Sequence, residues 1–185
     1  MKRSVWIGLS ALALAVAIPA AASTFVALTP GELVAQSDAI VQGRVLKVSS
    51  FWSPSGRLIV SEAMIQVEET IAGRAPSVVV LRTAGGTVGG YTVEAHGFPK
   101  FAVNDRLVLF VQGASDLAKV TGYQQGQYRI VRDKGGVEMA IPTLGQGVRL
   151  LRPDGRAVEL PKALPLADFK AGIRAEALRN RPFEN

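Results

Sequence analysis

The sequence predicts a mainly β protein, built as a barrel or a sandwich, with a short N-terminal helix and a C-terminal amphipathic helix. Many short segments rich in apolar and β-branched residues are separated by Gly, Pro, Asn and Asp turns, which is typical of small β-barrels and sandwiches. Helical patterns occur in one segment near each end of the chain. Because the chain has no cysteine, packing rather than disulfides must stabilise this fold.

The first 22 residues have the features of a cleavable secretory signal peptide. Two basic residues precede an almost wholly apolar run at 5–18, and Ala20 and Ala22 provide the small residues of an A-x-A cleavage site. The apolar run is shorter than the about 20 residues of a membrane-spanning helix. An uncleaved N-terminal anchor is the alternative. We therefore expect an exported protein, periplasmic or extracellular, without an integral membrane span after the signal is removed.

Cleavage after Ala22 leaves about 160 residues, enough for one domain with its own core. We expect residues 23–145 to form the barrel, and residues 146–185 to form a late hairpin and a helix packed on it. The whole chain carries a formal net charge of +6. Its basic residues are scattered and are not interleaved with aromatic residues, so nucleic acid is not an expected partner.

The predicted elements begin with a helix. Thr29 is a capping residue, Pro30 suits the first helical position, and Glu32 completes a capping box. Residues 39–48 then alternate in polarity and predict a strand, in which Gly43 indicates a bulge or a sharp bend.

The middle of the chain predicts a series of strands joined by turns. In chain order, these strands are expected at residues 58–69, 77–82, 91–95, 106–111, 123–131 and 137–140. The glycine-rich stretch 83–90 lacks the Lys-Ser/Thr ending of a P-loop and leads into a strand rather than a helix. A flexible or tightly turned β-connection is therefore the better interpretation than a phosphate cradle.

The end of the chain predicts a hairpin followed by the strongest helix. Residues 149–151 and 157–160 flank a Pro-Asp-Gly turn, which is a hairpin pattern. Residues 165–180 have helical periodicity. Their apolar residues on one face are Leu166, Phe169, Ile173 and Ala177.

Within residues 37–113, the segments S-D-A-I-V-Q-G-R-V, S-E-A-M-I-Q-V-E-E-T-I-A-G, V-V-V-L-R-T-A-G-G and F-P-K-F-A-V-N-D-R-L-V-L-F-V form a recognisable order. This layout resembles a family of uncharacterised exported bacterial proteins. It is also similar to the netrin-like OB barrel, the fold of the N-terminal domain of tissue inhibitors of metalloproteinases. In netrin-like domains a V-x-G-x-V strand leads to a long second strand and then to a Lys-Gly turn. In this chain residues 41–45 match the first strand, and Ala72-Gly73 matches the turn. A Gly-x-x-Tyr-Leu strand is matched loosely by residues 104–108.

The resemblance implies an OB-like barrel, closed or partly open. It also implies a proteinase inhibitor or protease-associated partner as one possible function, with a secreted or envelope protease as the partner. Those inhibitors chelate the catalytic zinc through an N-terminal cysteine and contain disulfides. The chain departs from that pattern, since it has no cysteine and its predicted mature N-terminus is Ser23.

Candidate binding residues lie in the predicted loops, where large rings and special backbone conformations often mark binding surfaces. The residues assigned to ligand or partner contact are Trp52, Arg57, Gly85, Gly86, Gly89, Gly90, His96, Phe98 and Phe101. The alternative favoured for the rings is that they plug the ends of the barrel. The amide side chains of residues 123–128 either contact a ligand or face water.

Catalytic and metal chemistry have little support. His96 is the single histidine of a chain without cysteine, so no zinc ligand set is expected, and no nucleophile-elbow pattern surrounds any serine. Glu68 and Glu69 are neighbours on one strand, so their side chains should point to opposite faces. We expect a non-catalytic exported binding module without a cofactor. A hydrolase remains open if Glu94, His96 and Asp105 assemble in space.

Overall fold

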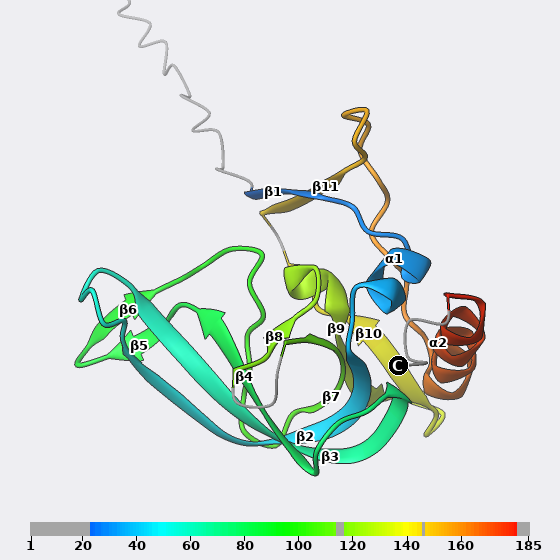
Figure 1. Ribbon diagram of the computed structural model, residues 1–185, viewed down its shortest axis with the longest axis horizontal. Coiled ribbons are helices and arrows are strands. Elements are labelled where there is room, and N and C mark those ends of the chain that lie inside the picture. Colours follow the sequence, from blue (N-terminus) through cyan, green and yellow to red (C-terminus); the bar gives the residue numbers. More distant parts are fainter. Residues whose placement is uncertain (1–22, 114–116, 146, 181–185) are drawn as a thin grey trace, which may run out of the picture.

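The structure of the protein is a computed structural model that describes residues 23–113, 117–145 and 147–180. The predicted signal peptide lies outside the described residues. The fold is mainly β, and its one long helix lies at the C-terminal end (Figure 1). Within the described residues, no helix has both the length and the apolar character needed to cross a membrane.

The elements follow the predicted order closely. They are β1 (Ser23–Val26), α1 (Pro30–Ala35), β2 (Ala39–Trp52), β3 (Ile59–Gly73), β4 (Val78–Ala84), β5 (Gly86–Val88), β6 (Tyr91–Val93), β7 (Arg106–Gln112), β8 (Lys119–Val120), the 3₁₀ turn η1 (Tyr123–Gly126), β9 (Gln127–Arg132), β10 (Glu138–Pro142), β11 (Val148–Leu151), β12 (Leu164–Pro165) and α2 (Leu166–Asn180).

One antiparallel sheet organises the molecule. Its strand order is β12-β10-β9-β7-β2-β3-β4, and β8 pairs with β7 beside this path. The ladder of paired strands is not closed. One isolated bridge, Leu81 with Ala118, connects β4 to the residue before β8, with hydrogen bonds of 2.9 Å from Arg82 N to Ala118 O and 3.2 Å from Ala118 N to Val80 O.

The two faces of the sheet bury separate apolar clusters. The inner cluster consists of Ala39, Val41, Val45, Ala63, Ile65, Val79, Leu81, Leu107, Leu109, Val111, Ala118 and Val120. The outer cluster consists of Leu33, Val34, Ile40, Ile71, Val108, Phe110, Tyr128, Ile130, Ala140, Leu166 and Ile173. Successive residues of β7 alternate between the two clusters because neighbouring side chains of a strand point to opposite faces.

Both helices cover the outer cluster, as their sequences predict. In α1 the capping box is formed: Glu32 N donates to Thr29 Oγ1 at 3.2 Å, and Thr29 N donates to Glu32 Oε2 at 2.7 Å. In α2, Leu166 and Ile173 are buried, and the other two residues of the predicted face pack against the same cluster. Local sequence signals therefore fix both helices.

Three predicted elements differ from the structure. Residues 123–126 form η1 rather than the start of a strand, because Gly122 and Tyr123 adopt positive φ angles of 63° and 59°. The stretch predicted as a glycine-rich connection contains β5, which pairs with β6. The late hairpin is shorter than predicted: around the Leu151–Ala157 bridge, Val158 N donates to Leu150 O and Arg152 N donates to Arg156 O, and β11 also pairs in parallel with β1.

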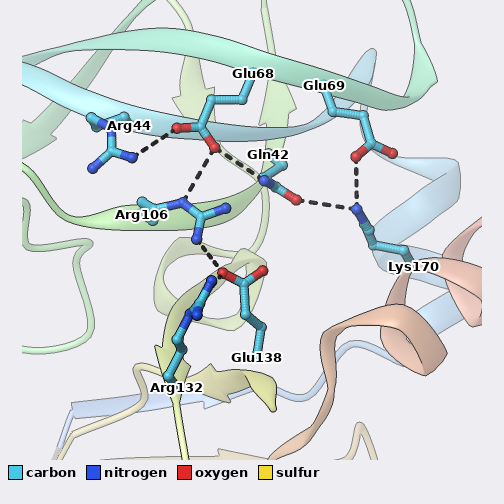
Figure 2. Close-up of polar contacts among 8 residues, drawn as sticks. All are labelled: Gln42, Arg44, Glu68, Glu69, Arg106, Arg132, Glu138 and Lys170. Carbon is cyan, nitrogen blue, oxygen red and sulfur yellow. Dashed lines mark hydrogen bonds and ion pairs between the residues drawn. The ribbon is translucent and has the colours of Figure 1, made fainter. Parts of the chain in front are cut away.

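A polar network continues the outer face beyond the apolar residues (Figure 2). The Gln42 amide lies at its centre. Its Nε2 donates to Glu68 Oε2 at 3.0 Å, and its Oε1 accepts from Lys170 Nζ at 3.2 Å. Lys170 also donates to Glu69 Oε2 at 2.7 Å. Both neighbouring carboxylates thus join one network, contrary to the expectation that they face opposite ways. Register shifts in the β2–β3 pairing, including one at Gln42, change the local alternation.

Arg106 connects this network to the far strands. Its Nε lies 3.3 Å from Glu68 Oε2, and its Nη1 donates to Glu138 Oε1 at 2.5 Å. The hydrogen bond from Arg106 lowers the pKa of the Glu138 carboxyl. Burial raises the pKa of Glu68, but the bond from Gln42 and the charges of Arg106 and Arg44 outweigh it and lower the pKa overall.

We expect Arg106→Met to lower the free energy of unfolding at pH 7 by about 1 to 2 kcal/mol, because two carboxylates lose a charge-assisted partner. Carboxyls with lowered pKa values stabilise the fold above their unfolded value of 4.5 and lose that effect as pH falls through the folded value. The difference between variant and parent should therefore shrink below pH 4.5. Urea unfolding at pH 7 and at pH 3 measures it.

Arg132→Met is the matched control. Arg132 also faces Glu138, but at 3.7 Å and with a side chain that is largely exposed, so its removal should have little effect. If Arg106→Met lowered the free energy of unfolding equally at pH 7 and at pH 3, the stabilising effect of Arg106 would not be electrostatic.

Candidate functional site

Two segments far apart in sequence pack together at the centre of the site. They are the loop 94–101, which follows β6, and η1 with the start of β9. Gln124 N donates to Gly97 O at 3.0 Å, and Gln127 Nε2 donates to Lys100 O at 2.8 Å. Residues of the two segments line two different hollows, which we call the polar hollow, after the charged side chains at its opening, and the apolar hollow, after its aromatic rings.

Close packing explains the backbone of these segments. Gly97 has a φ of 85°, and a Cβ built there would lie 2.1 Å from the ring of Phe25. Gly122 also has a positive φ, and its Cβ would lie 2.7 Å from Leu28. Tyr123 keeps φ at 59°, a region that bulky residues rarely adopt. Such conformations persist only where the surroundings enforce them, and they concentrate at functional sites.

The polar hollow has a volume of about 570 Å³. Its buried residues are Gly97, Gln124 and Gln127, and its exposed charged or ionisable residues are Glu94, His96, Lys100 and Arg129. Val131, Ile141, Pro142 and Val148 contribute an apolar side. We call the first group the floor and the second group the rim.

The two floor amides differ in their hydrogen bonding. Gln127 uses both ends of its amide, since its Oε1 also accepts from Thr143 Oγ1 at 3.0 Å. Gln124 is only 8% exposed, and its Oε1 accepts no hydrogen bond from any described residue. A buried acceptor without a donor costs about 1 to 3 kcal/mol. The Oε1 atom is itself buried, so its missing partner is a cost to folding and not an acceptor offered to the open hollow.

The rim charges form two ion pairs. Lys100 Nζ lies 3.1 Å from Glu94 Oε1, and Arg129 Nη2 lies 3.1 Å from Asp105 Oδ2. The hydrogen bond from Lys100 and its charge lower the pKa of the Glu94 carboxyl. Asp105 does not line the hollow. Of the three residues considered for a hydrolase, the hollow therefore brings together Glu94 and His96, while Asp105 reaches it only through Arg129.

The apolar hollow, of about 760 Å³, lies on the other side of the packed segments. Tyr123 stands between Phe25 and Phe98, with ring centroids 5.1 and 4.9 Å away. Phe98 thus lines this hollow, whereas Phe101 packs against the inner cluster and lines a separate, smaller hollow with Gly85 and Gly86. The two phenylalanines of one loop have different roles.

Trp52 and Arg57 lie elsewhere, at the hairpin end where β2 turns into β3. Trp52 is 42% exposed and packs edge-on against Tyr91 of β6, which is 69% exposed, with centroids 6.2 Å apart. Arg57 is exposed in the turn before β3. The β5–β6 hairpin and α2 lie at opposite sides of the molecule (Figure 1). Trp52 and Arg57 do not line the hollow that His96 lines.

The four predicted glycines have structural roles. Gly89 and Gly90, with φ of 56° and 85°, form the two-residue turn between β5 and β6. Gly85 and Gly86 also have positive φ, and a Cβ at Gly86 would lie 2.4 Å from Ser61 Oγ. Within this stretch the tight turn is therefore at Gly89-Gly90, whereas residues 86–88 form β5.

The residues assigned from sequence to ligand contact did not include Lys100 or Arg129. For the amides of residues 123–128 the sequence left ligand contact and exposure to water open, and Gln124 and Gln127 are buried. Within the described residues, no group of three or more His, Asp and Glu side chains is suited to hold a metal ion.

The sequence matches no model of a known protein family, and no curated protein is significantly similar to it. The function is therefore argued from the geometry of the site alone.

We expect Gly86→Ala to lower the free energy of unfolding by about 2 to 4 kcal/mol, because it adds both backbone strain and a clash with the Ser50 and Ser61 hydroxyls. Gly89→Ala is the control: its φ is also positive, but nothing lies within 4 Å of the added Cβ. It should cost about 1 kcal/mol. Equal melting temperatures for the two variants would contradict the role of close packing.

Proposed function

We propose that the protein is an exported, non-catalytic binding module that takes a small ligand in the polar hollow. The observation that carries this proposal is the concavity itself, in which four exposed ionisable side chains surround a floor with two buried amides. The volume of the hollow lies within the usual range of small-molecule sites, about 300 to 1,000 Å³.

The arrangement favours binding over hydrolysis. A general base in a triad needs a third group that orients its ring. Between described residues, no hydrogen bond holds the His96 ring. The Thr143 hydroxyl, which also lines the hollow, bonds to the backbone and side-chain oxygens of Gln127 instead of to a histidine. These contacts support a site that holds a molecule rather than one that attacks it.

The fold proposal is an OB-like barrel formed by β2, β3, β4, β7 and β8. The Leu81–Ala118 bridge supports it, because β8 pairs with β7 and so leads from the free edge of β4 back towards the sheet. The inner cluster is the expected filling of such a small barrel. The resemblance to netrin-like domains rests on the same strand order.

The proteinase-inhibitor alternative has weaker support. Zinc chelation of the kind used by tissue inhibitors of metalloproteinases would require the nitrogen of Ser23, if the signal is cleaved after Ala22. Ser23 N donates to Gly147 O at 2.7 Å, and β1 is paired along its length with β11. Chelation would compete with this pairing.

Export is tested at the proposed cleavage site. Expression in a bacterial host should give a protein whose mass corresponds to a start at Ser23. Ala22→Phe should leave the precursor uncut, because the cleavage enzyme requires a small residue there. Ala21→Phe, at the tolerant middle position of the A-x-A site, should be processed normally. Accumulation of an uncut parent protein in the membrane fraction would contradict cleavage.

Ligand binding is tested by NMR titration with a panel of sugars, amino acids, organic acids and nucleotides. We expect amide shifts of residues 94–100 and 124–129, with Trp52→Ala binding as well as the parent protein. The bound molecule should be recovered chemically unchanged. Shifts confined to the Trp52–Tyr91 end would contradict the choice of site, and conversion of the ligand would contradict a non-catalytic role.

A further inference from the structure

Two hairpins end together on the side of the molecule away from α2 (Figure 1). Trp52, next to the turn between β2 and β3, contacts Tyr91, next to the turn between β5 and β6. The second hairpin lies directly on the first, because a Cβ at Gly86 would be 2.4 Å from Ser61 Oγ and 2.5 Å from Ser50 Oγ. Both turns therefore project from the same end. We call residues 52–58 and 86–93 the tip.

The tip exposes large apolar side chains. Tyr91 is the most exposed aromatic ring among the described residues, Leu58 is 60% exposed, and Trp52 and Val93 are also exposed. None of these four side chains lines the polar hollow or the apolar hollow. The two rings are inclined to each other at 61°, so they do not form one flat face on which a base could stack. A projecting apolar surface of this kind marks contact with another protein or with a membrane.

The charge of the tip decides between these partners. Arg57, exposed in the first turn, is its one charged residue, and neither half of the tip contains Asp or Glu. The carboxylates next to it in sequence, Glu62 and Glu94, are each in an ion pair with a basic residue. An anionic surface therefore meets little repulsion at the tip and is attracted by Arg57. The combination of Trp, Tyr and a basic residue is the one that proteins place at the membrane–water interface.

We propose that the tip inserts shallowly into the headgroup region of an anionic lipid bilayer. The rings of Trp52 and Tyr91 lie among the headgroups, where their apolar bodies leave water while their N–H and O–H groups stay hydrated. Leu58 adds apolar area, and the long Arg57 side chain extends its guanidinium to the lipid phosphates. This contact is independent of the polar hollow, whose lining includes none of these residues.

Tryptophan fluorescence tests the insertion directly. The sequence has two tryptophans, and Trp6 lies in the predicted signal peptide, so the emission of a chain that starts at Ser23 reports on Trp52 alone. That chain keeps every described residue. Vesicles of phosphatidylglycerol mixed with phosphatidylcholine are the anionic probe, and vesicles of phosphatidylcholine are the neutral one. We expect a blue shift of the emission and co-sedimentation with the anionic vesicles, with binding to the neutral vesicles about fivefold weaker.

Two matched variants locate the contact. Leu58→Glu places a negative charge in the tip and should weaken vesicle binding about tenfold or more and remove the blue shift. Leu178→Glu makes the same change in net charge at a side chain that is 78% exposed on α2, and it should bind as the parent does. Because both side chains are exposed, the melting temperatures should stay close to that of the parent. Tyr91→Thr is a second tip variant, which should weaken binding about threefold.

Four outcomes would overturn the proposal. One is that neither kind of vesicle binds. Another is co-sedimentation without an emission shift and lost at high salt, which would mean that scattered basic residues attract the lipid without insertion. Equal loss in Leu58→Glu and Leu178→Glu would show that the tip is not the contact. A blue shift that rises with protein concentration in the absence of vesicles would show that two copies associate through the tip. If Leu58→Glu does not fold, Tyr91→Thr decides the location by the same measurements.

Discussion

The pairing of β2 on both of its edges is the constraint on which the rest of the structure depends. β2 pairs with β3 along its whole length and with β7 over residues 39–44. Its first five residues are buried, so their backbone groups have no access to water and must bond to other strands. The backbones of β2 and β3 approach closely at Gly43, since a Cβ there would lie 2.6 Å from Gln66 O. The two faces of this pairing define the inner and outer clusters.

The floor of the polar hollow follows from the same pairing. β8 and β9 both pair antiparallel with β7, one after the other along the same edge, so the residues between them bulge out of the ladder and return to it in the same direction. Positive φ angles at Gly122 and Tyr123 make this bulge possible. Thr121 fixes its start, because its N–H donates to Phe110 O at 2.8 Å and its hydroxyl bonds to Ser37 Oγ at 2.7 Å in the interior. Gln124 is therefore positioned by the sheet through a tightly anchored turn, which suits a binding group.

How far sequence predicts this protein depends on the range of the interactions. The capping box at Thr29 and the apolar face of α2 are local patterns, and both were predicted correctly. The parallel pairing of β1 with β11 joins residues more than 100 positions apart, and no local pattern indicates it. Residues 123–131 were predicted as one strand, whereas the left-handed conformation at Tyr123 depends on its packing between Phe25 and Phe98. The hollow could not be predicted, because separate segments contribute to it.

The two polar clusters of the molecule show why Gln124 is informative. In the network of Figure 2, the amide of Gln42 donates to one charged partner and accepts from another. That arrangement suits a structural role, since a fully bonded buried amide connects strands without a desolvation penalty. Gln127 is satisfied in the same way. Gln124 is not, although an apolar residue of similar size would fill the same space without leaving an acceptor unpaired. The amide at position 124 therefore costs the fold stability that the bonded amides of Gln42 and Gln127 do not cost.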